Sequence, residues 1–193
     1  MARPREFDED EVLERALGLF WSRGYDATSV QDLVDATGLS RASLYGAFGD
    51  KDALFRKVLD RYVERASPLG ALDRSLPAPE ALRALVRAWV DGACDARGPR
   101  GCFLLLTATS SNDATSAQQI LAASVADTER KLAAYLRERR AAGELPEGRD
   151  PKDLARLLVV TQHGVASMAR AGVDRALLRA ASKEALAHVL GDA

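Results

Sequence analysis

The chain is poor in the residues and runs that mark several large classes of protein. Its 193 residues include two cysteines and seven prolines, and 6% of them are aromatic. Two cysteines cannot form a disulfide scaffold, and a reducing compartment would keep Cys94 and Cys102 as thiols. No signal sequence opens the chain, and no apolar run approaches the ~20 residues that span a bilayer. We therefore expect a cytoplasmic protein that does not enter a membrane.

Strand signals are missing as well, and so is a surplus of charge of one sign. No alternating run of Val, Ile, Thr and Tyr occurs, while alanine and arginine are abundant and hydrophobic residues make up 47% of the chain. This composition predicts an all-α protein with a buried core. The net charge of −1 does not indicate a nucleic-acid partner, because phosphate binding usually accompanies a basic excess. Evidence for such a partner must come from local patterns.

Sequence motifs of enzymes are absent too. The chain has no glycine-rich phosphate loop, no H-E-x-x-H and no G-x-S-x-G. His163 and His188 have no carboxylate or cysteine at the spacing that metal ligands need. We expect no catalysis, no metal ion and no cofactor.

Residues 28–51 carry the most informative local pattern, two short helices joined by a glycine-bearing turn. Thr28 and Gln31 have the spacing of a capping box, which predicts the start of the first helix. Gly38 supplies the left-handed residue that ends it. This layout is typical of a helix-turn-helix and points to a protein that reads DNA.

The second short helix is predicted to be the recognition helix. Ser40 is its N-cap, and Leu44 and Phe48 point inward. The side chains left for solvent or a partner are Arg41, Ala42, Ser43, Tyr45 and Gly46. Asp50 caps a third helix whose first turn carries Lys51, where a cation is unfavourable for the helix dipole. We expect Lys51 to meet an anion.

Four groups of residues occur in a fixed order between Leu13 and Tyr62. An aromatic group, Phe20-Trp21-Ser22-Arg23-Gly24-Tyr25, ends an amphipathic helix and is followed by Thr28-Ser29-Val30. Gly38 then forms a turn, and the last group is a Leu-Tyr-x-x-Phe-x-x-Lys made of Leu44-Tyr45, Phe48 and Lys51. In these residues the chain resembles the DNA-binding domain of the TetR family of bacterial one-component transcriptional repressors. It departs from the family pattern at Gly46 and Ala47, where bulkier or imidazole side chains are common, so its base-reading set is smaller.

The resemblance and the exposed residues predict a DNA-binding set. Its members lie in or beside the two short helices: Thr28, Ser29, Ser40, Arg41, Ala42, Ser43, Tyr45, Gly46 and Lys51. The neighbouring cations outnumber the acids slightly; they are Arg41, Lys51, Arg56, Lys57, Arg61 and Arg65. Arg3 and Arg5 form a short basic arm that either follows a DNA groove or stays disordered.

The segment 67–79, with three prolines and a glycine, breaks the helical pattern and separates a DNA-binding domain, 1–66, from an effector-binding and dimerisation domain, 67–193. Helical stripes in the second domain predict helices over 82–93, 102–110, 114–142, 151–171 and 174–190. The helix over 102–110 is almost wholly apolar, so we expect it to be buried on all sides. The resemblance implies about nine helices in all.

The last two helices have more apolar and small surface than one neighbour can cover. Their inner stripes are assigned Leu157, Met168 and Leu177, among others, and a second face carries Ala155, Val159, Gly164, Ala166, Ala169, Ala180 and Ala187. The resemblance implies that these helices pair with a second copy in a four-helix bundle, which matches a palindromic operator. The alternative is a monomer with an Ala-rich composition.

The resemblance also implies a small-molecule effector that releases the operator. Candidate effector-binding residues combine apolar walls with polar tips: Trp89, Phe103, Leu104, Leu106, Thr107, Tyr135, Gln162 and His163. His163 is equally a candidate for a hydrogen-bonded structural histidine, and each aromatic for a core residue.

Cys102 is a candidate redox sensor. It starts a predicted helix, whose free amides favour a thiolate, and Arg100 lies two residues before it. Three alternatives remain open: Gly101-Cys102 only allows close packing, Cys102 serves a thiol-based redox or conjugating enzyme, or the chain is a helical interaction module without a ligand.

Overall fold

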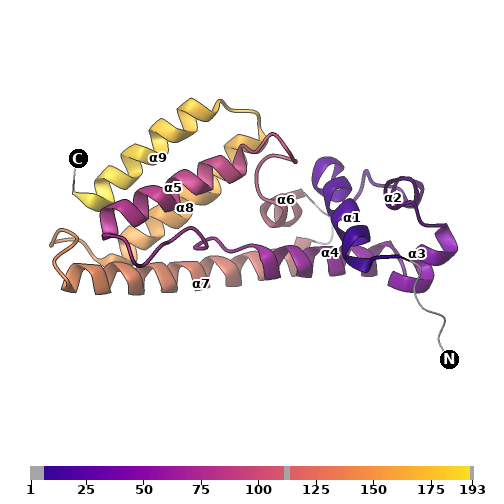
Figure 1. Cartoon of the computed structure of the whole chain (residues 1–193), viewed down its shortest axis with the longest axis horizontal. Coiled ribbons are helices and arrows are strands. Elements are labelled where there is room, and N and C mark those ends of the chain that lie inside the picture. The colour runs from indigo at the N-terminus through magenta and orange to yellow at the C-terminus, as the bar shows by residue number, and fades with distance from the viewer. Residues whose placement is uncertain (1–6, 111–113, 192–193) are drawn as a thin grey trace.

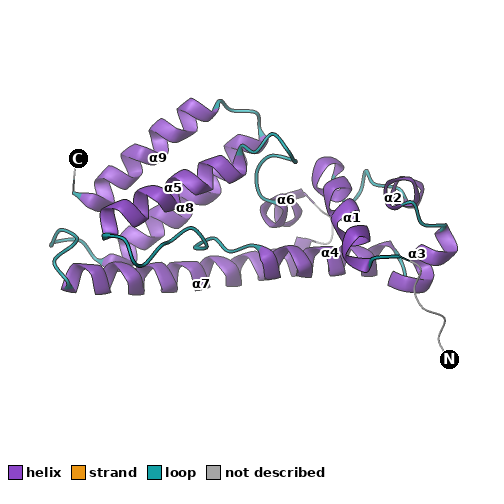
Figure 2. Cartoon of the chain, in the orientation of Figure 1, coloured by secondary structure: helices purple, strands orange, loops and turns teal. Residues whose placement is uncertain are grey.

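The computed structural model describes residues 7–110 and 114–191. These residues form nine α-helices and no strand (Figures 1 and 2). The helices are α1 (Glu9–Arg23), α2 (Val30–Thr37), α3 (Arg41–Phe48), α4 (Lys51–Arg65), α5 (Ala78–Ala93), α6 (Phe103–Ser110), α7 (Ala114–Ala141), α8 (Pro151–Arg170) and α9 (Arg175–Leu190). The predicted all-α class is confirmed. The basic arm at Arg3 and Arg5 lies outside the described residues.

The helices form two groups that α6 joins. Helices α1 to α4 form a head at one end of the molecule, and α5, α8 and α9 stack above the long α7 at the other (Figure 1). Contacts link α1 with α2 and α4 in the head, and α8 with α5, α7 and α9 in the body. Helix α6 contacts α4 on one side and α7 and α8 on the other, so it lies between the head and the body.

The first helix of the helix-turn-helix begins one residue later than predicted. The N-cap of α2 is Ser29, whose hydroxyl accepts a hydrogen bond from the Asp32 amide, while the Asp32 carboxylate accepts one from the Ser29 amide. Thr28 is fully buried, and its hydroxyl donates to the carbonyl oxygen of Gly24 at 2.7 Å. The capping box predicted for Thr28 and Gln31 is therefore wrong, because the Thr28 side chain closes the preceding turn.

The predicted caps on both sides of α3 are confirmed, whereas the helix predicted over 82–93 begins earlier, at Ala78. Gly38 adopts φ 74°, and its amide donates to the Val34 carbonyl oxygen at the end of α2. Ser40 accepts a hydrogen bond from the Ser43 amide, and Asp50 accepts one from the Ala53 amide. These caps satisfy backbone groups that helix termini leave without a partner, so they fix the turns on both sides of α3.

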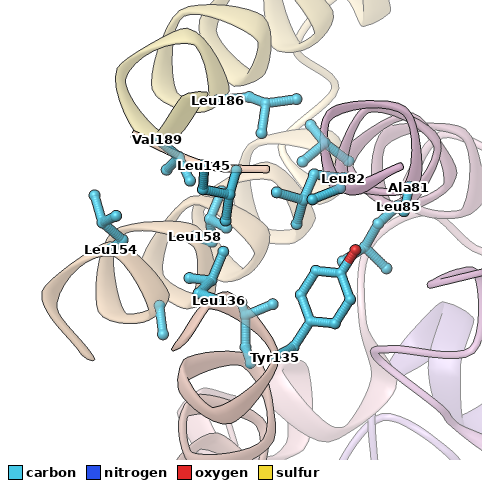
Figure 3. Close-up of a cluster of buried hydrophobic side chains, with 14 of the residues drawn as sticks. Ala81, Leu82, Leu85, Tyr135, Leu136, Leu145, Leu154, Leu158, Leu186 and Val189 are labelled. Carbon is cyan, nitrogen blue, oxygen red and sulfur yellow. The ribbon is translucent and has the colours of Figure 1, made fainter. Parts of the chain in front are cut away.

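A large cluster of buried apolar side chains joins the helices of the body. Leu82 and Leu85 of α5 pack with Leu136 of α7 and Leu158 of α8, and Leu186 and Val189 of α9 close the cluster (Figure 3). Tyr135 is fully buried within it, and no described residue is a hydrogen-bond partner of its hydroxyl.

A second cluster joins the head to α6. Phe20, Leu33, Phe48 and Leu54 of the head are buried together with Phe103 of α6, and the start of α7 adds Ala117. The prediction that this helix is buried on all sides is wrong, because Thr109 and Ser110 at its C-terminal end are exposed. Its buried face packs against α7 and α8 of the body as well as against α4 of the head.

The two faces assigned to α8 and α9 are partly exchanged. Ala155, Val159, Ala166 and Ala169 are buried within the chain, where small residues let α8 approach its neighbours closely. Exposed apolar side chains are instead Val160, Met168 and Leu177, at 70%, 53% and 59% of their maximal area. Sequence periodicity alone placed Met168 and Leu177 inside, because both sides of these helices are apolar.

None of the helices within the described residues is long and apolar enough to cross a membrane.

Candidate DNA interface and ligand cavity

Helix α3 presents a continuous exposed face. Leu44 and Phe48 are buried against the head, and the side chains of Arg41, Ala42, Ser43, Tyr45 and Gly46 are exposed. Arg41 forms no ion pair with any described residue, so its guanidinium keeps its five donors. A helix of this size, anchored by two residues and exposed elsewhere, fits the width of a DNA major groove.

Lys51 lies next to this face, at the first turn of α4. Its ammonium is 4.0 Å from the centre of the Tyr25 ring, within the range of a cation–π contact. None of the described residues supplies the anion expected for Lys51. The ring holds the side chain in place and leaves its N–H groups for an external phosphate.

The remaining predicted DNA-binding residues divide into accessible and inaccessible ones. Ser29 and Ser40 are exposed, but both hydroxyls already serve as helix caps, and Ser40 also bonds the Ser43 hydroxyl at 2.9 Å. Thr28 is buried, so its side chain cannot reach a phosphate in this conformation. We therefore remove Thr28 from the candidate interface.

Three of the six nearby cations form ion pairs with acids of α1. Lys57 pairs with Glu9 at 3.3 Å, and Arg61 pairs with Asp10 and Glu14. The hydrogen bond from Arg61 holds the pKa of the Asp10 carboxyl below its usual value. Arg65 also pairs with Glu14. These cations join α4 to α1 and are not available to DNA, whereas Arg41, Lys51 and Arg56 form no ion pair with described residues.

A cavity of about 280 Å³ lies where the end of α4 meets the body. Trp89, Leu104, Gln162 and His163, all predicted effector-binding residues, line it. The other lining residues are Tyr62, Val63, Ala66, Ser67, Pro68, Gly92, Ala93, Gly101, Cys102, Leu121, Ser124 and Ala166. No described residue that lines the cavity has an acidic, lysine or arginine side chain.

The polar atoms of this cavity are unevenly satisfied. The Trp89 indole N–H donates to the Pro68 carbonyl oxygen at 2.6 Å, and His163 Nδ1 lies 2.8 Å from the Val159 carbonyl oxygen. The side-chain oxygen of Gln162 is buried and has no hydrogen-bond partner among the described residues. Because buried acceptors are rarely left unpaired, this oxygen can accept a hydrogen bond from a bound molecule.

The other predicted effector residues are not in this cavity. Phe103, Leu106 and Thr107 line a separate space of about 150 Å³ between α6 and the head, with Tyr25 and Phe55 among its walls. Tyr135 lies in the body core. These residues have the mixture of apolar and polar character that is typical of ligand sites, but the sequence alone could not show which of them face the same space.

The structure adds Tyr62 to the candidate residues. Its hydroxyl lies 3.5 Å from Cys102 Sγ and 3.4 Å from the Phe103 amide, which donates to it. Burial raises the pKa of Tyr62 far above its usual value, so the hydroxyl stays protonated. Tyr62 is on α4 and Cys102 precedes α6, forty positions away, so no local sequence signal could have paired them.

Arg100, the cation expected to favour a thiolate at Cys102, has a hydrogen-bond partner of its own. Arg100 donates to the Val173 carbonyl oxygen at 3.4 Å, in the loop between α8 and α9. Gly101 packs so closely on α8 that an added Cβ would lie 2.8 Å from the Ala166 carbonyl oxygen.

No group of His, Cys, Asp and Glu residues in the described part of the chain could hold a metal ion.

Two family models match the chain. The model described as "Bacterial regulatory proteins, tetR family" matches residues 12–58, which include α2 and α3. The model described as "Tetracyclin repressor-like, C-terminal domain" matches residues 78–185.

Individual proteins are similar to this chain as well. The HTH-type transcriptional repressor ComR of Escherichia coli (strain K12) is 36% identical over 178 residues, 89% of this chain and 84% of ComR. The HTH-type transcriptional repressor BdcR of the same strain is 36% identical over 105 residues, 53% of each protein.

A solved structure shares both the fold and the sequence. A cysteine mutant of the TetR family transcriptional regulator CifR, complexed with 26-bp double-strand operator DNA, gives a TM-score of 0.82 at 33% identity. The match covers 95% of this chain and 98% of the CifR chain. One family model matches more than half of this chain, and the repressor ComR is 36% identical to it over most of ComR's length. This chain therefore belongs to the TetR family of bacterial transcriptional regulators.

Proposed function

We propose that this protein is a cytoplasmic homodimeric repressor that binds a palindromic operator and releases it when a small molecule occupies the cavity at the end of α4. The exposed face of α3, with Arg41 unpaired and Lys51 beside it, is the observation that carries the DNA-binding part. The structure of CifR with operator DNA supports this part of the proposal, because CifR is similar to this protein over nearly the whole chain.

The DNA contacts divide by chemistry. Arg41, Ala42 and Ser43 lie in the first turn of α3, the part of a recognition helix that approaches base edges. Tyr45, Lys51 and the exposed Ser29 are placed to contact phosphates, which fix the position of the helix without reading sequence. Ser40 and Gly46 complete the interface, Ser40 as the cap of α3 and Gly46 by allowing close approach.

A second copy covers the exposed apolar face of α8 and α9. Val160, Met168 and Leu177 are far more exposed than apolar side chains of this size usually are when they lie together in a monomer. Pairing through this face is self-complementary about a two-fold axis. It sets two α3 helices roughly 34–36 Å apart, one turn of B-DNA, where a palindrome repeats its half-sites.

Helix α4 connects the ligand to the DNA. Its first residue is Lys51, and near its other end Tyr62 and Val63 line the cavity. A rigid helix of fifteen residues is about 22 Å long, so a small displacement at Tyr62 moves the head. A ligand that fits only the displaced position shifts the population away from the DNA-binding conformation.

The cavity favours a small uncharged ligand. A volume of about 280 Å³ is just below the usual range for small-molecule sites, and the lining offers hydrogen-bonding groups but no acidic, lysine or arginine side chain. The unpaired oxygen of Gln162 selects a ligand with an N–H or O–H donor. Trp89, Leu104 and His163 supply the adjoining walls.

Cys102 suggests a second class of effector, an oxidant or electrophile. Its sulfur lines the same cavity and contacts Tyr62 of α4, so modification at this position would press directly on the helix that carries the head. The alternative is that Gly101 and Cys102 serve only close packing against α8, which the short distance from Gly101 to Ala166 supports. A thiol enzyme is not favoured, because the two regulator-family models match residues 12–58 and 78–185, and the second includes Cys102.

The DNA assignment is tested by selecting an operator from random DNA and titrating it at several salt concentrations. Arg41→Ala should cost about 1–3 kcal/mol and relax the preference at one base position. Lys51→Ala should weaken binding to all sequences and reduce the salt dependence. Lys152→Ala, at the far end of the body, is the control and should change neither. Wild-type binding by both head variants across the salt series would reject the assignment.

A further inference from the structure

We infer that the groove between α5 and α9 is a second ligand site, which takes a small anion with an aliphatic tail. The groove has a volume of about 770 Å³, much larger than the cavity at the end of α4. That volume is within the usual range for small-molecule sites. The inference concerns a different part of the body and does not depend on the proposed effector cavity.

The floor of the groove is apolar. Val86 and Val90 of α5 and Leu186 and Leu190 of α9 line it, and each pair is spaced by about one helical turn. The aliphatic stems of long basic side chains rise from both helices beside this floor. An alkyl chain can lie between the stems and remove apolar surface from water.

The rim is strongly basic. Arg83 and Arg87 of α5 and Arg179 and Lys183 of α9 line the groove, against the single acid Glu184. Arg87 and Lys183 form no ion pair with described residues, whereas Arg179 shares Asp91 with Arg175. This concentration of cations occurs in a chain whose net charge is −1, so it is a local feature. Cations over an apolar floor match an anionic head group on an aliphatic tail.

The groove is separate from the face proposed for dimerisation. Val160, Met168 and Leu177, the exposed apolar residues of α8 and α9, line no part of it. Residues 179, 183, 186 and 190 of α9 follow each other at helical spacing and define the side of α9 that faces α5. Of the residues that line the groove, Glu184 lies on the Leu177 side of α9, seven residues after Leu177, so the groove and the face proposed for dimerisation meet at this rim.

Helix α5 lines both the groove and the effector cavity. Val86, Arg87 and Val90 line the groove, while Trp89 and Ala93 of the same helix line the cavity. A ligand in the groove that moves or stiffens α5 would also change the positions of Trp89 and Ala93, which line the cavity. The groove can thus adjust the response to the effector without touching α4.

The probe is n-decanoate, titrated by calorimetry into the full-length protein. We expect decanoate to bind, and n-decanol and acetate to bind at least about tenfold more weakly, because each lacks either the charge or the tail. The double variant Arg87→Gln and Lys183→Gln should weaken decanoate by about tenfold or more, since charged hydrogen-bond donors are lost. Lys152→Gln changes an exposed charge away from the groove and should leave the affinity unchanged.

A diazirine derivative of decanoic acid locates the site independently of any substitution. Cross-links to residues 83–87 and 179–190 support the inference. Cross-links to Tyr62, Ser124 or Gln162 would assign the anion to the effector cavity and overturn it. Equal affinities of the double variant and the wild type, or equal affinities for decanoate and decanol, would overturn it as well. The operator titrations with Arg41 and Lys51 variants are unaffected by either result.

Discussion

Replacement of Gly101 by alanine should destabilise the fold more than the loss of backbone freedom alone explains. Gly101 has φ +91°, a conformation that residues with a Cβ rarely adopt. Its amide donates to the Ala93 carbonyl oxygen at 2.9 Å, which ties the end of α5 to the start of α6. An added Cβ would lie 2.8 Å from the Ala166 carbonyl oxygen and 3.0 Å from the Arg170 Cβ.

The expected cost has two parts. A left-handed conformation costs a residue with a Cβ about 1–2 kcal/mol. Forcing an extra carbon against the α8 backbone adds about 1–3 kcal/mol, as overpacking usually does, because a backbone carbonyl cannot rotate away like a flexible side chain. For a chain of this length, about 3 kcal/mol lowers the melting temperature by on the order of 10 °C.

Gly148→Ala is the matched control. Gly148 has φ +104°, and nothing lies within 4 Å of the position of its Cβ, so alanine there incurs only the conformational cost. Both variants should be unfolded in urea at one protomer concentration, because a dimer gains stability as concentration rises. If Gly101→Ala loses no more free energy of unfolding than Gly148→Ala, the argument from close packing on α8 is wrong.

Three further predictions address assembly, the thiol and the junction of α1 with α4. Ala180→Glu, on the exposed side of α9, should bury an unpaired carboxylate between protomers and yield a monomer in sedimentation at micromolar concentration; a dimer would place the interface elsewhere. A limiting maleimide should label the half-buried Cys102 faster than the buried Cys94, and operator release by an electrophile should be lost in Cys102→Ser; equal labelling, or continued release, would leave only a packing role. Asp10→Asn should lower stability at neutral pH, where the Arg61 contact depresses the carboxyl pKa, and the difference from wild type should vanish as the pH falls through that folded-state pKa; a constant difference would refute the ion pair.

The sequence predicted the helix-turn-helix well because its signals are local. Gly38, Ser40 and Asp50 each act on backbone groups within a few residues, and all three have their predicted roles. Thr28 and Ser29 are adjacent hydroxyl residues with an acceptor three positions after each. Local spacing therefore permitted two capping boxes, and packing against the Gly24 carbonyl decided between them.

Properties that depend on how the helices are placed were predicted less well. Met168 and Leu177 fit an inner stripe as well as an outer one, because α8 and α9 are apolar on two sides. Arg61 and Arg65 look available for DNA until α1 is packed against α4 and supplies its acids. The cavity collects residues from five separate segments, so composition could suggest its members but not separate Trp89 and His163 from Phe103 and Tyr135.

The packing of α6 changes the proposed route from the ligand to the DNA. A head carried by α4 alone would respond only to movement of that helix. Phe103 of α6, however, packs against Trp21 and Phe55 of the head, and its amide donates to the Tyr62 hydroxyl. Cys102, one residue earlier, lines the cavity. A ligand there therefore meets the end of α4 and the start of α6 together, and both belong to the buried cluster that supports α3. Because that cluster is closely packed, it transmits a displacement of either helix rather than absorbing it.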